Sequence, residues 1–179
     1  MWAISDPRND AALGAALRRL PRGSGLVLRH YHLTPGERRA RLNRLARIAR
    51  ARGHAVVLAG SAGLARAWRA DGAYGAPRLL AKGPRLLRLA TAHSLRELAA
   101  AHRARADAVL LSPVHPTRSH PGGKALGRLR FRLIARHALV PVIALGGMTA
   151  QRARALQWPR WAAIDGICGK AKRRIPKDS

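Results

Sequence analysis

The sequence predicts an α/β protein: a compact (β/α)8 TIM barrel forming one domain over residues 1–169, followed by a basic C-terminal tail over 170–179. Short apolar runs alternate with longer Arg- and Ala-rich stretches along nearly the whole chain, as in repeated strand-helix units. The apolar runs are continuous, which is typical of parallel strands buried on both faces. The chain has 179 residues, against roughly 250 in most such barrels, so we expect shortened fourth and eighth helical connections.

Eight apolar runs are the candidate strands. They lie at 2–5, 26–29, 55–59, 72–74, 86–90, 108–111, 140–145 and 163–167. Only 75–85 separates the fourth run from the fifth, and only 168–179 follows the eighth. Both segments are too short for a full helix with its loops, so we expect the helical connections to be shortened there.

Six segments between these runs have helical character, at 9–20, 35–52, 61–69, 94–105, 126–137 and 149–157. Start signals support three of them. Thr34 precedes Pro35, a capping residue followed by a proline in the first turn. Ser94 has Glu97 three residues later, which predicts a capping box. Thr149 follows two glycines and is placed to cap the segment after it.

The charge is strongly positive, with 35 Lys and Arg against 8 Asp and Glu, a formal net charge of +27. Such a chain attracts polyanions at low salt. However, the arginines are spread over every predicted helix, and the aromatic content of 4% leaves few platforms for base stacking. We therefore interpret most arginines, including those of 35–52, as solvated helix faces, and we expect non-specific polyanion binding in vitro more than a dedicated nucleic-acid surface.

Cysteine usage and hydropathy favour a cytoplasmic location. Cys168 is the only cysteine, so no internal disulfide can form, and it has no evident partner histidine, which favours a buried structural thiol. No apolar run approaches the roughly 20 residues of a membrane-spanning helix, and residues 1–6 lack the features of a secretory signal. The histidines and the cysteine show no zinc pattern. A homodimer is compatible with the sequence, which leaves the oligomeric state open.

Functional residues of such barrels lie at the carboxyl ends of the strands. Here the sixth predicted strand runs into a polar loop, 112–124, and the seventh ends in Gly146-Gly147, where small residues expose backbone N–H groups ahead of a helix. Together these segments predict an anion-binding rim. Taken singly, the two glycines also fit a plain tight turn, and His115 and His120 also fit ordinary loop residues flanked by prolines.

The order of motifs resembles the family of thiamine phosphate synthase and thiazole tautomerase (TenI). The matching segments follow the family order across nearly the whole chain: Ile4-Ser5-Asp6, Leu28-Arg29, Ala70-Asp71-Gly72, Ala92-His93-Ser94, Ala106-Asp107-Ala108, Ser112-Pro113-Val114-His115-Pro116-Thr117, Pro141 to Thr149, and Asp165-Gly166. The resemblance implies a (β/α)8 barrel acting on small phosphorylated substrates. In the synthase, an aminopyrimidine methyl pyrophosphate loses pyrophosphate with the help of Mg²⁺, and the nitrogen of thiazole phosphate captures the resulting cation.

The resemblance also implies roles for individual residues. Arg29, His115, His120 and Lys124 are the expected catalytic residues. The expected substrate and phosphate ligands are Thr91, Thr117, Ser119, Gly146 and Gly147, with Cys168 and Gly169 standing in the place of the strand-eight phosphate loop.

The chain departs from the synthase pattern at its metal-binding positions. Ala59-Gly60 stand where the pattern has Asn-Asp, and the segment after the fourth strand, 75–78, lacks the acidic ligand. His120, with Lys124 nearby, replaces the lysine of the sixth loop. Mg²⁺ is thus implied by the resemblance while its ligand positions are not retained, and we assign no metal ligand. We predict synthase-like chemistry; the alternatives are a metal-independent tautomerase that uses His115, and a non-catalytic barrel that binds a phosphorylated ligand or a polyanion.

Overall fold

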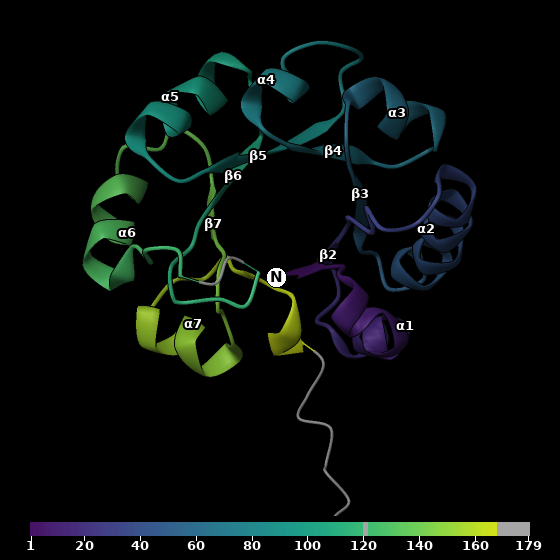
Figure 1. Ribbon diagram of the computed structural model, residues 1–179, viewed down its shortest axis with the longest axis horizontal. Coiled ribbons are helices and arrows are strands. Elements are labelled where there is room, and N and C mark those ends of the chain that lie inside the picture. The colour runs from purple at the N-terminus through teal and green to yellow at the C-terminus, as the bar shows by residue number, and fades with distance from the viewer. Residues whose placement is uncertain (120–121, 168–179) are drawn as a thin grey trace, which may run out of the picture.

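A computed structural model describes residues 1–119 and 122–167 and confirms the (β/α)8 barrel. Eight parallel strands stand in the order β7-β6-β5-β4-β3-β2-β1-β8, and Figure 1 looks down the barrel with the helices in a ring outside them. The strands are β1 Trp2–Ile4, β2 Gly25–Leu28, β3 Ala55–Ala59, β4 Gly72–Gly75, β5 Leu87–Ala92, β6 Ala108–Leu111, β7 Val142–Ala144 and β8 Ala162–Ala163. Each of the eight lies in or overlaps a predicted run.

The six predicted helices are present, together with one-turn elements. They are α1 Asp10–Arg19, α2 Pro35–Arg50, α3 Ala62–Ala67, α5 Leu95–Arg103, α6 Gly127–Ala135 and α7 Ala150–Leu156. The short fourth connection holds a single turn, α4 Pro77–Leu80. Two 3₁₀ helices, η1 Pro7–Asn9 and η2 Asp165–Ile167, follow β1 and β8. The eighth connection and the predicted tail lie outside the described residues.

Capping residues start the helices largely as predicted. Thr34 forms a full capping box with Glu37, since each side chain accepts a hydrogen bond from the backbone N–H of the other residue. Thr149 accepts from the N–H of Arg152. Ser94 accepts from the N–H of Glu97, but the Glu97 carboxylate accepts from the N–H of His93, so the predicted reciprocal box is only half formed.

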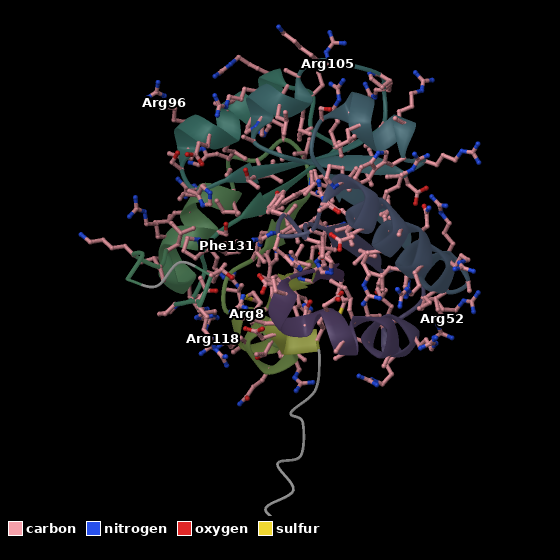
Figure 2. The ribbon with its side chains drawn as sticks, turned by 45° about the vertical axis from the view of Figure 1, so that its right-hand side comes forward. Arg8, Arg52, Arg96, Arg105, Arg118 and Phe131 are labelled. Carbon is pink, nitrogen blue, oxygen red and sulfur yellow. The ribbon has the colours of Figure 1, made fainter. Side chains whose placement is uncertain are left out.

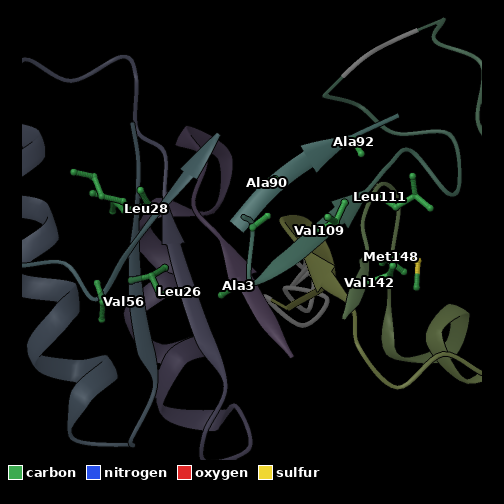
Figure 3. Packing of buried hydrophobic residues seen from close by; sticks show 14 of the residues in the cluster. Ala3, Leu26, Leu28, Val56, Ala90, Ala92, Val109, Leu111, Val142 and Met148 are labelled. Atoms are coloured by element: carbon green, nitrogen blue, oxygen red, sulfur yellow. The ribbon is translucent and has the colours of Figure 1, made fainter. Parts of the chain in front are cut away.

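The barrel closes through a minimal contact between β7 and the residues just before β8. A single parallel bridge joins Ala144 to Trp161, and the Ala144 N–H donates to the carbonyl of Arg160 at 2.9 Å. On the other side, β8 pairs with β1 over two residues. The buried residues divide into two layers, as side-chain alternation along each strand requires. One cluster, including Ile4, Val57 and Leu110, fills the barrel interior. The larger cluster packs strands against helices, and Figure 3 shows part of it.

Three sequence expectations need correction. The eighth strand ends at Ala163, not at residue 167, because the Asn9 side-chain amide takes the Ile164 carbonyl and the chain then turns into η2. The fifth strand continues to Ala92, so Thr91 lies within it. The arginines of α2 are not uniformly solvated: Arg38 is half-buried and donates to the Ala59 carbonyl at 2.5 Å.

Across residues 1–119 and 122–167, no helix combines the length and apolar character needed to cross a membrane.

Candidate functional site

A cavity of about 760 Å³ opens at the carboxyl ends of the strands. Its walls come from β4, β5 and β8, and from the segments that follow β2, β6, β7 and β8. Seven of the predicted site residues line it: Arg29, Thr91, Thr117, Ser119, Lys124, Gly146 and Gly147. The expected rim is therefore a single hollow that brings together residues up to 118 positions apart in the chain, from Arg29 to Gly147.

Arg29, Tyr74 and Thr91 line the cavity near the carboxyl ends of β2, β4 and β5. Arg29 stands one residue past β2, where its own N–H donates to the buried Ser5 hydroxyl at 2.7 Å. Burial raises the pKa of Tyr74 to about 12, against the smaller opposing effect of the Arg29 charge. The phenol thus stays neutral at physiological pH and keeps its proton for donation. The Arg29 guanidinium and the neutral hydroxyls of Tyr74 and Thr91 are groups that can together bind an anion.

The loop after β6 is tied to the ends of β1 and β8 by Arg8, a residue of η1. The Arg8 guanidinium contacts Asp6 at 2.7 Å and Asp165 at 3.4 Å, and donates to the Ser119 hydroxyl at 2.9 Å. The hydrogen bond from Arg8 is the main reason why the pKa of Asp6 lies below its usual value. Ser119 also donates its N–H to the Thr117 hydroxyl at 3.4 Å. This arrangement sets both hydroxyls at the cavity edge.

Two glycines let the loop after β7 pass directly against the loop after β6. Gly146 and Gly147 have φ of +95° and +60°, in the region that L side chains rarely adopt. A Cβ on Gly146 would lie 2.6 Å from the Cα of Pro113, and one on Gly147 would lie 2.6 Å from the Pro116 carbonyl oxygen. Arg152 folds over the same turn and donates to the Gly147 carbonyl at 2.5 Å. Both glycines are therefore required by the geometry of the rim.

The predicted histidines are placed differently. His115 is half-buried and lies beside the cavity, not in its lining. Burial, with a smaller effect from the Arg152 charge, lowers the pKa of His115. His93 does line the cavity, and its Nδ1 lies 2.7 Å from the Ser112 carbonyl oxygen. A carbonyl can only accept, so Nδ1 carries the proton and Nε2 of the neutral ring is the basic nitrogen. His120, Cys168 and Gly169 lie outside the described residues.

The donor set does not fit Mg²⁺, which prefers several oxygen ligands including carboxylates. Asp165 is the one carboxylate among the described lining residues, and Arg8 already contacts it. Within 1–119 and 122–167, no three His, Cys, Asp or Glu side chains gather in a way that could hold a metal ion. Ala59, Gly60 and the 75–78 segment carry no acidic side chain that could add a ligand.

Comparison with known proteins agrees with this barrel. The family model described as thiamine monophosphate synthase matches residues 2–169. The chain belongs to the thiamine monophosphate synthase family. A segment of 62 residues is 36% identical to the putative thiamine-phosphate synthase 2 of Aquifex aeolicus; it covers 35% of this chain and 33% of that relative, so the match spans about a third of either protein.

Solved structures support the family fold. Thiamine phosphate pyrophosphorylase from Pyrococcus furiosus superimposes with a TM-score of 0.76 at 22% identity, over 91% of this chain and 83% of that one. The enzyme of that name from Bacteroides thetaiotaomicron gives a TM-score of 0.61 at 16% identity, over 92% and 81%. At these sequence identities the structural similarity is evidence of the fold alone.

Sequence reasoning missed several residues that build this family member's site. The sequence predicts Tyr74 as a strand residue and Arg152 as a solvated helix arginine, while Arg8 lies outside every predicted element. Only strand alternation gives a signal for Tyr74, since it places the side chain on the same face as the interior residues. The contacts of Arg8 join segments more than 100 residues apart, and nothing local in the sequence reports them.

Proposed function

We propose that the chain is a thiamine phosphate synthase-like enzyme that joins aminopyrimidine methyl pyrophosphate to thiazole phosphate with loss of pyrophosphate. The observation that carries the proposal is the single cavity in which Arg29, Thr117, Lys124 and the Gly146-Gly147 turn come together. It supplies cations and hydroxyls for two phosphorylated groups. The apolar side chains of Leu145 and Ile164 in the same lining supply surface for the two heteroaromatic rings.

In this reaction the bond between the pyrimidine methylene carbon and the pyrophosphate oxygen breaks, and the electron pair leaves with pyrophosphate. The thiazole ring nitrogen then donates its lone pair to the methylene carbon and forms the new C–N bond. Negative charge grows on the leaving oxygen, so positioned cations and hydrogen-bond donors stabilise the transition state. Arg29 and Lys124 are the charged candidates for this role. Tyr74 and Thr91 are the neutral donors nearest the barrel interior.

Holding both substrates in one cavity removes much of the entropic cost of the coupling step. We assign Thr117 and the Gly146-Gly147 turn to the phosphate of the thiazole substrate, as the family pattern implies. The Gly146-Gly147 turn and the loop that carries Thr117 lie in close contact, so both can reach one phosphate.

Turnover tests the proposal directly. Purified protein is incubated with both substrates and Mg²⁺, and thiamine phosphate is oxidised and measured by fluorescence. We expect product well above a no-enzyme control and a loss of at least tenfold in Thr117→Ala. The matched control is Thr34→Ala, which removes a hydroxyl from a helix cap that is not part of the cavity lining. Absence of product from a folded sample would refute the coupling activity and leave the tautomerase and the non-catalytic binder as the accounts to examine.

The tautomerase alternative needs a group in the cavity that transfers protons. His115 is not in the lining, whereas His93 is, with a defined basic Nε2. If coupling fails, His93→Gln separates the two remaining accounts. A tautomerase would lose proton exchange on thiazole phosphate in this variant, and a non-catalytic barrel would show no exchange in either form.

A further inference from the structure

Positive side chains dominate the described lining of the cavity. Arg29, Arg118, Lys124 and Arg152 line it, against the single carboxylate of Asp165. At physiological pH inorganic pyrophosphate carries about three negative charges, and Arg and Lys are the side chains that bind phosphate oxygens most directly. The lining therefore holds enough positive charge to neutralise pyrophosphate with side chains alone.

The two carboxylates at the ends of β1 and β8 are occupied by an internal cation. Arg8 contacts Asp6 through Nε at 2.7 Å and Asp165 through Nη1 at 3.4 Å, while Nη2 donates to Ser119 at 2.9 Å. Each of the three guanidinium nitrogens therefore contacts a different segment at this end of the barrel. A divalent cation seeking these two carboxylates would have to displace a side chain that is covalently part of the fold.

The same guanidinium holds the rim together. Asp6 lies just before η1, Asp165 begins η2, and Ser119 belongs to the loop after β6. A guanidinium fork is rigid and planar, so its three bonds fix the relative positions of these segments. Figure 2 shows Arg8 and Arg118 in the same region of the molecule, while Arg96 extends outward from the helical shell.

We propose that this cavity binds pyrophosphate without a divalent cation, with Arg29, Lys124 and Arg118 in direct contact and Arg8 as the positioning residue that ties Asp6 and Asp165 to the loop after β6. The inference rests on the proposed function in that it assigns pyrophosphate to the same site. The site would thus differ from that of the family pattern, in which Mg²⁺ assists the departure of pyrophosphate.

Calorimetric titration of inorganic pyrophosphate into the whole chain tests the inference, once in EDTA and once in excess Mg²⁺. We expect binding in EDTA with a Kd equal to or lower than that in Mg²⁺, because Mg²⁺ neutralises part of the charge that the arginines recognise. Binding that appears only with Mg²⁺, or that Mg²⁺ tightens tenfold or more, would overturn the inference.

Matched variants separate the site from the general positive charge. We expect Arg29→Gln and Lys124→Gln each to weaken pyrophosphate binding in EDTA at least tenfold. Arg96→Gln removes one charge from an exposed position on α5 and should leave Kd within about twofold. Equal weakening in all three variants would mean diffuse attraction and would contradict the site. Circular dichroism and urea unfolding confirm that each variant is folded.

Arg8→Gln tests the positioning role. Without the guanidinium, Asp6 and Asp165 lose their internal cation, so we expect weaker pyrophosphate binding in EDTA and partial recovery on adding Mg²⁺. Wild-type protein should show no such recovery. A variant that binds as tightly as wild type in EDTA would refute the role of Arg8.

The two proposals fail in different ways. If pyrophosphate binds in EDTA but no thiamine phosphate forms, the metal-free site stands and the coupling activity falls. If thiamine phosphate forms but pyrophosphate binding requires Mg²⁺, the coupling activity stands and the metal-free site falls.

Discussion

At the scale of single residues, the rim of this barrel depends on how closely backbones can approach. The Gly146-Gly147 turn passes within contact of Pro113 and Pro116, and both glycines have positive φ. Elsewhere in the chain a positive φ occurs in open space, as at Gly53. Comparing alanine substitutions at Gly147 and Gly53 therefore separates the free-energy cost of a positive φ from that of a steric clash.

Gly147→Ala should destabilise the fold more than Gly53→Ala does. Both residues have similar φ, +60° and +68°, so both variants meet the cost of roughly 1–2 kcal/mol for a left-handed L residue. Only the alanine at 147 also meets a carbonyl oxygen at 2.6 Å. We expect its free energy of unfolding in urea to fall by about 1–3 kcal/mol more than that of the Gly53 variant. Equal losses would show that the loops separate at no cost.

His115 should make stability depend on pH near neutrality. Its pKa is lowered in the folded state, so between the folded and unfolded pKa values the unfolded chain binds more protons. The contribution of the neutral ring is complete above the unfolded value of about 6.5 and is lost as pH falls below it. We expect wild type to lose more stability between pH 7.5 and about 5.5 than His115→Gln does, measured by urea unfolding at each pH. Parallel pH profiles would contradict this.

A residue's place in the site was predictable where it belongs to a family motif at the end of a strand. It was not predictable where it depends on contacts between segments that are distant in the sequence. Arg29, Thr117 and Gly147 follow from strand ends and family order, and they do line the cavity. His115 has the right chemistry, but its backbone N–H is taken by the Gly146 carbonyl and its ring packs beside the cavity. Arg8 acts through segments that only the closed barrel brings together.

At the scale of elements, the eight strands were predictable because each is a continuous apolar run, but their ends were not. The seventh run is apolar over 140–145, while β7 spans only Val142–Ala144; Pro141 is exposed and Val140 and Leu145 are only partly buried, so apolar character extends beyond the paired residues. The end of β8 is set by Asn9, which donates to the carbonyls of both Ile4 and Ile164. Side-chain capture of this kind leaves no periodic pattern in the sequence.

Helix α2 is anchored by an arginine that composition alone assigns to solvent. Arg38 donates to the Ala59 and Leu28 carbonyls, and its guanidinium lies 5.3 Å from the ring centroid of Tyr31 and 5.7 Å from that of Trp68. These contacts join the first turns of α2 to the ends of β2 and β3, next to Arg29. The position of α2 and the shape of the cavity mouth are therefore linked.

Arg38→Ala should cost about 1–2 kcal/mol of unfolding free energy, because two carbonyls lose a charged donor and two rings lose a cation. Arg44→Ala, at an exposed position of the same helix, should change it by less than about 0.5 kcal/mol. Arg and Ala have similar helix propensity, so the comparison isolates the tertiary contacts. Urea unfolding of the two variants measures the difference, and a loss shared equally by both would remove the anchoring role.

At the scale of the whole molecule, the chain folds under a large excess of positive charge. Eight acidic residues cannot neutralise 35 Lys and Arg. Five aspartates form the ion pairs found in the described part of the chain, and most of these lie at strand and helix ends. Many of the remaining arginines lie on the outer face of the barrel, and Figure 2 shows Arg52, Arg96 and Arg105 extending from the helical shell in different directions.

Salt should therefore stabilise this protein. Mutual repulsion among surface cations raises the free energy of the compact state more than that of the expanded chain, and the Debye length falls from about 10 Å at 0.1 M salt to about 3 Å at 1 M. If screening raises the free energy of unfolding by about 1–2 kcal/mol, Tm rises by roughly 2–8 °C for a chain of this size. We expect that rise between 0.05 and about 0.5 M NaCl, and a smaller one in a variant with Arg44, Arg96 and Arg105 changed to Gln. Chloride screens charge without resembling pyrophosphate, so the rise should be the same in Arg29→Gln. A flat or falling Tm would mean that dispersing the arginines over the outer face of the barrel already makes their repulsion negligible.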